Sequence, residues 1–535
     1  MRPVEQLQRN LAALRAVDAA LAERLSSPRP APHVIEASDG AVFYKVSQTP
    51  LRLSIAGSMP SMERTNLLLG VGAGELLLTA IATAGDRLIA YERDPALWQL
   101  ALSRVDVVEA LQAGRLRVCL GVDLLEELPL PADAKVLSHP VLGELYTDEH
   151  AWIQGQSGAR RALVLQGGLF VRELTRELRR RGFAPFPLHL GHVDPTEALR
   201  TARKLAPELI VAVNVPPGAE TLAAQAGVSL LCWEIDPAVH LLKVPAHEAE
   251  RAFVFTFRER YVDELKTQGY VHVEHLPLAA DPTTRAPVSL TAAEREHYGA
   301  RVCFVGTSMV EDAPRWERLF LKAYAQRRPA AEGRSVLASV LAAQRRDFGH
   351  DGVALALANH CRGFGPTEMD ILARCAQEIA AAERRVVYAS RLGRFGLQVW
   401  GDAGWRVAEG AGVRYRGTAG SYTDLNAIYC SAGVNVDIGR LHQLDIVTMR
   451  IFDVMACGGF VLAERSKDLE RLFEIGREVD CYSTLEELEQ KVDHYLTHPN
   501  AARALAEAGR RAVLERHTVA QRVDRMLQRM AIPTA

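Results

Sequence analysis

The sequence lacks long apolar runs, a surplus of charge of one sign and an apolar leader. No stretch approaches the run of about 18 uncharged apolar residues that a membrane-spanning helix needs. The first ten residues carry charge where a signal peptide needs an apolar stretch. The formal net charge is -2, whereas binding to nucleic acid normally requires a basic face. These absences argue against a transmembrane segment and a nucleic-acid partner, and they predict a cytoplasmic protein.

Cysteine is present but never in a paired spacing. The eight cysteines are scattered, and no two have the spacing of a zinc or redox motif. Several lie inside apolar runs, such as Cys303 within Arg301–Val305, which predicts small buried side chains in a reducing compartment. No Asp-x-Asp motif stands in a context suited to a metal ion. We therefore expect no metal site and no required cofactor.

The hydrophobic pattern is that of an α/β protein. At 535 residues the chain is too long for a single hydrophobic core. A helical segment to about Glu23 is followed by short apolar strands that alternate with longer helical segments. Parallel strands require such crossovers, so this rhythm predicts parallel sheets covered by helices. The expected strands are 41–46, 51–55, 66–69, 87–91, 116–119, 162–165, 209–213, 230–232, 302–305, 385–388, 397–400, 433–437 and 460–462.

So many strands exceed one sheet of usual size. Breaks in the pattern near 155–160 and near 282–291 divide the chain into three α/β parts. We expect a helix and short strands over 1–50, a Rossmann-like domain over 51–158, and further α/β lobes over 159–288 and 289–535.

A glycine-rich turn follows the first expected parallel strand. Gly70, Gly72 and Gly74 lead into an expected helix over 75–84, so the backbone can turn tightly and approach a ligand. Glu92 ends the next strand, where a carboxylate can accept hydrogen bonds from ribose hydroxyls. The spacing departs from the dinucleotide fingerprint, which asks for a third glycine three residues beyond the second. The turn therefore fits a nucleotide or S-adenosylmethionine pocket, or a compact turn that binds nothing.

The most informative stretch begins at Ser431. Asp445 and Asp453 are separated by seven residues, and Arg450 lies between them. An expected helix over 448–456 places Asp445 before its N-terminus, Arg450 near its start and Asp453 in its second turn. Carboxylates suit the hydroxyl groups of ribose and hexose, whereas arginines and helix N-termini suit phosphates. The stretch thus predicts one helix end that presents both acids and an anion-binding surface to a nucleotide-diphosphate sugar.

Residues 230–530 resemble the CgeB-like (spore-protein type) family of GT-B glycosyltransferases. The motifs that carry the resemblance are Trp233–Pro237, Phe253–Phe257, His275–Asp281, Val302–Ser308, Val399–Asp402, Asp437–Arg440, Asp445–Gly459, Asp468–Glu478, Tyr482–Leu488 and His517–Thr518. The resemblance implies two Rossmann-like lobes, of which the C-terminal lobe binds a nucleotide-sugar donor. It also implies that donor binding needs no metal ion.

The same resemblance suggests roles for single residues. Asp453 takes the ribose-binding place and Asp445 the hexose-facing, catalytic place, although the broader GT-B pattern has the longer Glu at both positions. Gly306, Thr307 and Ser308 follow the first strand of the expected donor lobe, where backbone N–H groups meet a diphosphate.

Gly401 follows another strand of that lobe and is expected to let the base approach. For each single glycine, a plain turn is the alternative interpretation. Asp236 follows a strand of the N-terminal lobe and is a candidate general base for the acceptor hydroxyl. It also fits the N-cap of the next helix. His192 and Asp194 form a weaker pair of the same kind.

Residues 30–130 resemble the Rossmann-like N-terminal part of motility-associated-factor glycosyltransferases, and they are also similar to class I methyltransferases. Three functions stay open. The first is transfer of a hexose-type sugar from a nucleotide-diphosphate donor to an unknown protein, glycan or small-molecule acceptor. The second is S-adenosylmethionine-dependent methyl transfer by the N-terminal domain. The third is binding of a sugar nucleotide without catalysis.

Overall fold

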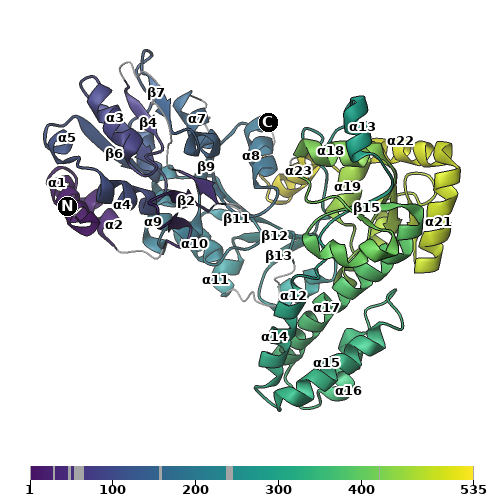
Figure 1. The fold of residues 1–535 in the computed structure, drawn as a ribbon. Coiled ribbons are helices and arrows are strands. Elements are labelled where there is room, and N and C mark those ends of the chain that lie inside the picture. The colour runs from purple at the N-terminus through teal and green to yellow at the C-terminus, as the bar shows by residue number, and fades with distance from the viewer. Residues whose placement is uncertain are drawn as a thin grey trace. The chain divides into compact units, whose positions relative to one another are not determined.

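The computed structural model describes residues 2–27, 31–45, 50–53, 65–155, 160–236, 245–420 and 422–533. The chain divides into two compact units (Figure 1). Unit 1 comprises Met1–Thr256, Arg260–Glu274 and Met526–Ala535, and unit 2 comprises Phe257–Glu259 and His275–Arg525.

The expected break near 155–160 falls largely on residues 156–159, outside the described ranges. The bounds of the four expected domains stay predictions. Among the described helices, none combines the length and the apolar character that crossing a membrane requires.

Unit 1 begins with a parallel sheet in the order β6-β5-β4-β7. Numbered along the chain this order is 3-2-1-4, which matches the first four positions of the Rossmann order 3-2-1-4-5-6. Its strands are β4 (Leu67–Leu69), β5 (Leu88–Glu92), β6 (Leu116–Leu120) and β7 (Val136–Ser138). Its helices are α1 (Pro3–Val17), α2 (Ala19–Ser26), α3 (Glu75–Thr83), α4 (Pro95–Arg104), α5 (Val108–Gln112), η1 (Gly121–Glu126), α6 (Leu142–Leu145) and α7 (Thr147–Ile153). A small antiparallel sheet accompanies it, with strands β1 (Val34–Glu36), β2 (Val42–Tyr44) and β3 (Leu51–Arg52).

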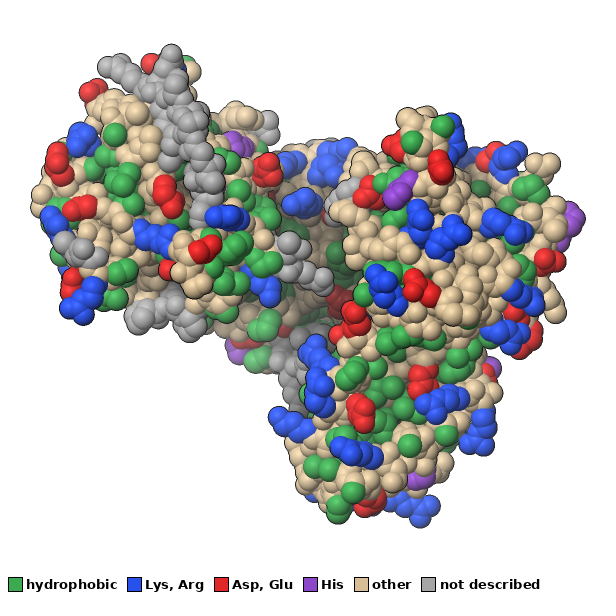
Figure 2. Space-filling view, viewed as in Figure 1, with side chains coloured by type: hydrophobic (Ala, Val, Ile, Leu, Met, Phe, Trp, Pro, Cys, Tyr) green, Lys and Arg blue, Asp and Glu red, His purple; other side chains and the backbone are tan. Residues whose placement is uncertain are grey.

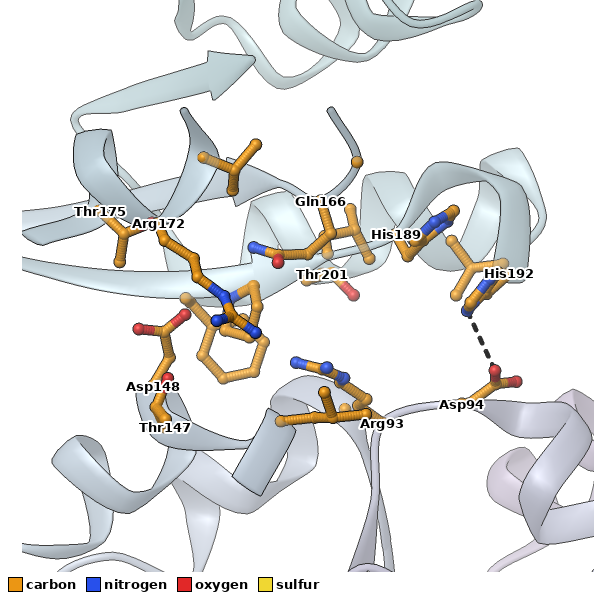
Figure 3. Close-up of a pocket in the computed structure, with 18 of the residues that line it drawn as sticks. Arg93, Asp94, Thr147, Asp148, Gln166, Arg172, Thr175, His189, His192 and Thr201 are labelled. Carbon is orange, nitrogen blue, oxygen red and sulfur yellow. Dashed lines mark ion pairs between the residues drawn. The ribbon is translucent and has the colours of Figure 1, made fainter. Parts of the chain in front are cut away.

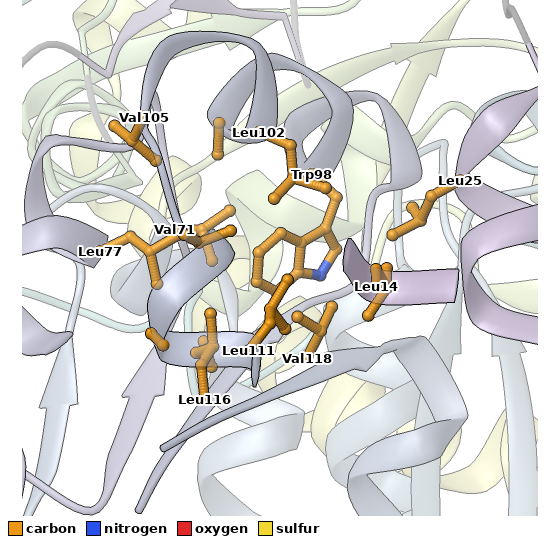
Figure 4. Packing of buried hydrophobic residues seen from close by; sticks show 14 of the residues in the cluster. Leu14, Leu25, Val71, Leu77, Trp98, Leu102, Val105, Leu111, Leu116 and Val118 are labelled. Atoms are coloured by element: carbon orange, nitrogen blue, oxygen red, sulfur yellow. The ribbon is translucent and has the colours of Figure 1, made fainter. Parts of the chain in front are cut away.

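The N-terminal helices belong to the core of this first sheet. The expected opening helix is two helices, because Asp18 ends α1 and its carboxylate accepts a hydrogen bond from the Leu21 amide as the N-cap of α2. Leu14 and Leu25 pack with the fully buried Trp98 in one hydrophobic cluster (Figure 4). The buried amide of Asn10 donates hydrogen bonds of 2.7 Å to two backbone carbonyls at the end of α4. Apolar burial and buried polar pairing thus both attach this segment to the sheet.

The second sheet of unit 1 has the order β13-β12-β11-β10-β8-β9. With β8 counted as strand 1 and the sheet followed from β9 to β13, the order is 2-1-3-4-5-6. The direction of the winding therefore reverses between β8 and β10. Its strands are β8 (Arg160–Leu165), β9 (Phe183–Leu188), β10 (Leu209–Val213), β11 (Ser229–Glu234), β12 (Ala252–Thr256) and β13 (His272–His275). Its helices are α8 (Val171–Arg180), η2 (Leu190–His192), α9 (Pro195–Leu205), α10 (Ala219–Ala226), α11 (Ala246–Ala249) and α12 (Tyr261–Thr267).

Unit 2 contains a parallel sheet in the order β16-β15-β14-β17-β18-β19, which is the full 3-2-1-4-5-6 Rossmann order. Its strands are β14 (Ala300–Val305), β15 (Leu397–Trp400), β16 (Arg414–Tyr415), β17 (Ala432–Val436), β18 (Val461–Glu464) and β19 (Asp480–Tyr482). Its helices are α13 (Ala292–Tyr298), α14 (Ala313–Tyr324), α15 (Ala330–Gln344), α16 (Val353–His360), α17 (Pro366–Leu392), η4 (Gly393–Phe395), η5 (Ala403–Ala411), α18 (Tyr422–Ser431), η6 (Leu441–Gln443), α19 (Met449–Ala456), α20 (Lys467–Leu472), α21 (Leu485–Thr497), α22 (Pro499–Arg516) and α23 (Val519–Arg529). The predicted α/β class with parallel sheets is confirmed.

One predicted strand is wrong. Residues 385–388 lie inside the 27-residue helix α17, which packs with α14, α15 and α16 around its own apolar cluster (Figure 1). The valine pair in this run favours a strand, but the alanine-rich sequence on both sides favours a helix. Burial of one face of α17 decides the outcome, because Arg385 and Tyr388 point inward.

Charged side chains of both signs are interspersed over the face shown in Figure 2. This agrees with the near-balanced numbers of basic and acidic residues.

Candidate functional site

The candidate donor site lies at the carboxyl edge of the unit 2 sheet, where the winding direction reverses between β14 and β17. In open α/β sheets ligands bind outside the carboxyl ends of the strands at such a reversal. The loops that leave these two strands begin at Gly306 and Asp437. Helix α19 begins nearby. The Thr448 hydroxyl donates to Asp437 in the loop after β17, and Nε of Arg450 donates to the Val305 carbonyl at the end of β14.

The turn after β14 is fixed by its own hydrogen bonds. The Gly306 amide donates to the Trp400 carbonyl at 2.9 Å, and the Ser308 amide donates to the Asp402 carboxylate at 2.6 Å. Two of the three N–H groups expected to meet a diphosphate are therefore engaged. The side chain of Thr307 is exposed, and its amide has no hydrogen-bond acceptor among the described residues. Within this turn, the Thr307 amide is the donor that remains for a ligand.

Gly401 serves the packing of the chain against itself. A Cβ atom at this position would lie 2.1 Å from the Gly306 carbonyl oxygen and 2.9 Å from Nε1 of Trp405. That indole nitrogen donates a 2.8 Å hydrogen bond to the same carbonyl. The absence of a side chain thus lets the loops after β14 and β15 touch, so the plain-turn interpretation accounts for this glycine.

Arg450 lies in the first turn of α19, as predicted, and points to the end of β14. Its Nε donates to the Val305 carbonyl at 2.6 Å, and its guanidinium lies 4.5 Å from the centre of the Phe304 ring. It also forms an ion pair with Asp437, which in turn accepts a 2.9 Å hydrogen bond from the Thr448 hydroxyl. Asp437 is almost completely buried. The guanidinium is therefore held in one orientation beside Gly306.

A second arginine at this edge was missed by sequence reasoning. Arg385 reaches from α17 and donates to the Thr307 carbonyl at 2.7 Å and to the Ile438 carbonyl at 3.1 Å. Burial, together with the nearby charges of Arg450 and Arg440, lowers the pKa of Arg385 to about 9. Desolvation by burial is the largest cause of this shift, and the like charges of the two neighbouring arginines add to it.

The signal for Arg385 was present in the sequence but read as a strand. Its neighbour Arg384 forms an ion pair with Glu464 and donates to the Gly439 carbonyl at 2.9 Å. One arginine of the pair is thus compensated by a carboxylate, whereas the other is bonded to carbonyl oxygens. A helical reading of residues 379–392 would have placed both on one buried face.

The two acids predicted to bracket Arg450 bind different arginines. Asp445 precedes α19, and its carboxylate accepts from Nε of Arg258 at 2.7 Å while the side chain is 42% exposed. Asp453 lies in the second turn of α19 and is buried, with Nε of Arg285 at 2.9 Å from its carboxylate. The helix position of each acid is as expected from the sequence. Asp445 is open to solvent, whereas Asp453 is held in a buried ion pair.

Asp236, the candidate general base, belongs to unit 1 and is exposed after β11. Its carboxylate accepts a hydrogen bond of 3.1 Å from the Asn214 amide, whose oxygen in turn accepts from the backbone of Ile235 and Asp236. The alternative role of the Asp236–Pro237 pair as a helix start cannot be described, because residues 237–244 lie outside the described ranges.

The first glycine-rich turn of unit 1 is packed against its own chain. Gly70, Gly72 and Gly74 all have positive φ angles, which explains the choice of glycine. A Cβ at Gly72 would lie 2.4 Å from Nε2 of His139, and a Cβ at Gly70 would lie 2.9 Å from Leu142. His139 is 1% exposed, so its ring occupies the concave side of this turn.

Glu92 is fully buried and its carboxylate is occupied by the protein. It accepts hydrogen bonds from the amides of Val71 at 3.2 Å, Arg93 at 2.9 Å and Asp94 at 3.2 Å, and from the Tyr146 hydroxyl. Burial raises its pKa to about 7, although these hydrogen bonds favour the charged form. The geometry favours a structural role in which Glu92 closes the turn over a role as a ribose acceptor.

A cavity of about 810 Å³ lies elsewhere in unit 1, where loops at the carboxyl ends of both its sheets meet (Figure 3). From the first sheet it is lined by Arg93 and Asp94, and from the second by Gly167, Arg172 and His192. The weak pair suggested from the sequence is not formed. His192 contacts Asp94, while Asp194 caps α9 by accepting from the Glu197 amide at 2.8 Å.

Similarity to known structures is broad but distant. A sucrose-phosphate synthase from Thermosynechococcus elongatus is 11% identical, with 70% of this chain and 99% of that chain covered and a TM-score of 0.40. A glycosyltransferase from Rickettsia africae ESF-5 is 10% identical, with coverage of 73% and 94% and a TM-score of 0.41. HepE of Anabaena, in complex with UDP and glucose, is 12% identical, with coverage of 70% and 98% and a TM-score of 0.38. Such low scores carry no argument about activity.

None of the curated protein sequences matches this chain. Residues 379–528, however, match the family described as Glycosyl transferase-like. The matched segment begins within α17, near Arg385, and contains β15 to β19 together with Asp445, Arg450 and Asp453. Residues 379–528 of the chain are therefore glycosyltransferase-like, and they lie within the stretch 289–535 that was expected from the sequence to bind a nucleotide-sugar donor.

Proposed function

We propose that the protein transfers a hexose-type sugar from a nucleotide-diphosphate donor bound at the carboxyl edge of the unit 2 sheet. The observation that carries the proposal is the excess of positive charge beside the turn after β14. Arg450 donates to the Val305 carbonyl at the end of β14, and Arg385 donates to the Thr307 carbonyl of the turn. Burial, together with the nearby charges of Arg450 and Arg440, lowers the pKa of Arg385. A diphosphate supplies negative charge, and guanidinium groups bind it with directional hydrogen bonds.

The chemistry of sugar transfer explains why fixed cations are needed at this place. The bond between the anomeric carbon and the diphosphate oxygen breaks, and the nucleoside diphosphate leaves with additional negative charge. Preorganised donors beside that oxygen stabilise the charge as it develops. We propose that Arg385, Arg450 and the Thr307 amide provide this stabilisation, so that donor binding needs no metal ion.

Carboxylates would complete the reaction. The acceptor hydroxyl forms the new bond to the anomeric carbon and gives its proton to a base. Asp445 is proposed to face the hexose, because it is exposed and its orientation is fixed by Arg258. Asp236 is kept as the candidate base because it is an exposed carboxylate. Asp453 is proposed to take ribose hydroxyls only if its ion pair with Arg285 rearranges.

We also propose a glycosyltransferase subtype and a kind of N-terminal domain. The motifs between residues 230 and 530 support a member of the CgeB-like type, and residues 30–130 support an N-terminal domain like that of motility-associated-factor glycosyltransferases. The methyltransferase alternative is not favoured, because His139 and Glu92 fill and close the turn that would bind S-adenosylmethionine.

A panel of diphosphates tests the proposal directly. Thermal stabilisation and calorimetry with uridine, guanosine and thymidine diphosphates are compared with S-adenosylhomocysteine. At least one diphosphate is expected to bind, and Arg385→Gln is expected to weaken that binding at least tenfold, since a bond to a charged group contributes about 1.5–3 kcal/mol. Arg391→Gln is the matched control, because Arg391 lies on the same helix but is half exposed and paired with Glu489.

Three outcomes would count against the proposal. Equal diphosphate binding by Arg385→Gln and the wild type would remove the assigned site. A response to S-adenosylhomocysteine alone would favour methyl transfer. Hydrolysis and transfer are followed by mass spectrometry with protein, glycan and small-molecule acceptors. Donor binding without either reaction would favour a non-catalytic binding protein. Asp445→Asn is expected to retain donor binding and to reduce turnover.

A further inference from the structure

Two histidines and an aspartate from three separate segments of unit 1 converge on one point. His33 precedes β1, Asp94 follows β5, and His192 ends η2. Nε2 of His33 lies 2.8 Å from Oδ2 of Asp94. Nδ1 of His192 lies 3.0 Å from the same oxygen (Figure 3). The three potential ligand atoms all lie within 4.8 Å of one another. We infer that this cluster binds a divalent transition-metal ion of the Zn²⁺ class.

The three side chains are buried and held in place by the protein. Their exposed fractions are 10% for His33, 1% for Asp94 and 9% for His192. Oδ1 of Asp94 accepts a 2.9 Å hydrogen bond from the Ala96 amide as the N-cap of α4. That bond orients the carboxylate so that Oδ2 faces both imidazoles. Orientation of a ligand carboxylate by a second hydrogen bond is the usual arrangement in metal sites.

Hydrogen bonding alone satisfies this cluster poorly. The Tyr44 hydroxyl also lies 3.0 Å from Oδ2 of Asp94, so three polar groups surround an oxygen that has two lone pairs. The same hydroxyl lies 3.3 Å from Nδ1 of His192. A cation among these atoms would make both imidazole nitrogens and the carboxylate oxygen ligands, and would leave the hydroxyl a single acceptor.

The residue types select the kind of ion. Neutral imidazole and carboxylate are ligands of zinc and related first-row ions, whereas calcium and magnesium prefer oxygen alone. The rings of His33 and His192 are stacked 3.7 Å apart with an interplanar angle of 6°. Binding an ion in the plane of both rings therefore requires a rotation of at least one ring about its Cβ–Cγ bond, and this rotation would be visible in a metal-loaded structure.

The site is accessible and joins parts of unit 1. Asp94 and His192 line the cavity of about 810 Å³, which gives an ion an entry path and room for water or an anionic group as a further ligand (Figure 3). His33 precedes β1 of the small antiparallel sheet, Asp94 follows β5 of the first parallel sheet, and His192 follows β9 of the second parallel sheet. A bound ion would therefore cross-link all three of these sheets of unit 1.

Metal content and binding are measured on the full chain after removal of metals with a chelator. The wild type is expected to bind one Zn²⁺ per chain by calorimetry, and to bind Co²⁺ with the visible absorption of a site of low coordination number. Zn²⁺ is expected to raise the melting temperature by several degrees, because it binds the folded state. The double variant His33→Gln, His192→Gln is expected to bind at least 100-fold more weakly.

Two variants serve as controls. His350→Gln alters an exposed histidine that pairs with Asp347, and His189→Gln removes a ring that stacks on His192 at 3.6 Å without belonging to the ligand set. Both are expected to retain the ion. Wild-type binding no stronger than that of the double variant would overturn the proposal and leave a hydrogen-bonded cluster. If the double variant does not fold in chelator, the wild-type Co²⁺ spectrum decides, and absence of its visible bands overturns the proposal equally.

Discussion

The first parallel sheet of unit 1 and the parallel sheet of unit 2 share their first four strand positions, in the order 3-2-1-4. Each has a glycine turn where the winding reverses. In unit 1 this turn is filled by His139 and closed by the buried carboxylate of Glu92. In unit 2 the equivalent turn is lined by two guanidinium groups, and one of them has a lowered pKa. The strand order around the two turns is the same. The unit 1 turn, however, is filled by an imidazole and a carboxylate, whereas the unit 2 turn is lined by guanidinium groups.

The difference separates fold from function. A glycine turn at a sheet reversal provides a place for a ligand, and the side chains around it decide whether a ligand or the protein itself occupies that place. At the unit 1 turn the protein supplies both an imidazole and a carboxylate. At the unit 2 turn it supplies two guanidinium groups, and within the described ranges no carboxylate forms an ion pair with Arg385. Variants at the two turns are therefore expected to have different phenotypes.

The largest effect is expected for Glu92→Leu. The change leaves three backbone amides and the Tyr146 hydroxyl without their buried acceptor. Each unsatisfied buried group costs about 1–3 kcal/mol, so we expect unit 1 to lose on the order of 4 kcal/mol of stability. Denaturant unfolding followed by probes in each unit measures this loss, and Glu92→Gln serves as the shape-conserving control. Binding of a diphosphate to the folded protein is expected to stay unchanged; loss of that binding would mean that the two turns act together.

The pH dependence of stability gives the next largest effect. Burial lowers the pKa of His139 to about 4, so its contribution is lost as the pH falls from its ordinary value near 6.5 toward 4. Burial raises the pKa of Glu92 to about 7, so its contribution is present at low pH and is lost as the pH rises from about 4.5 through 7. Each effect reaches about 3 kcal/mol, and the two oppose one another.

The two substitutions should separate these opposing slopes. Relative to the wild type, His139→Gln is expected to become more stable as the pH falls below 6, and Glu92→Gln as the pH rises above 5. Urea unfolding of unit 1 between pH 4.5 and 7.5 measures both differences. Parallel curves for the wild type and both variants would show that neither group is charged differently in the folded and unfolded chains.

The smallest effects come from adding one methyl group at each turn. In Gly72→Ala the new Cβ meets His139 at a residue with φ of 55°, so we expect a loss of about 1–2 kcal/mol of stability and no change in diphosphate binding. In Gly306→Ala the new Cβ lies 2.8 Å from Nη2 of Arg450, so we expect a smaller loss of stability and at least tenfold weaker diphosphate binding. Calorimetry and thermal unfolding on both variants measure the two quantities. Equal phenotypes would remove the distinction between the two turns.

The sequence predicted much of the architecture because the relevant signals are local. Short apolar runs located most strands of the first and third parallel sheets and half of those of the second. Helix α19 begins at Met449, within one residue of the expected position. Arg450 was correctly placed near the start of that helix, whereas its hydrogen bond to the end of β14 was seen only in the structure. A short β-branched run misled the prediction at 385–388, because the helix there is decided by burial against distant segments.

The missing parts of the candidate sites depend on contacts between residues far apart in the chain. His139 fills a turn that lies 67 residues before it at Gly72, and His192 meets an aspartate 98 residues before it. Asp453 is bound by Arg285, which no motif singled out. A single sequence carries no local sign of such pairings, so they were found only in three dimensions.

The C-terminal helix has a practical consequence for anyone who shortens or tags this chain. Helix α23 begins in unit 2, but the segment from Met526 onward belongs to unit 1. There the carbonyl of Pro533 accepts a 2.7 Å hydrogen bond from Arg160 on the first strand of the second sheet, and Arg529 forms an ion pair with Glu274. Removing residues 526–535 would therefore take contacts away from unit 1, although the residues that directly precede them belong to unit 2.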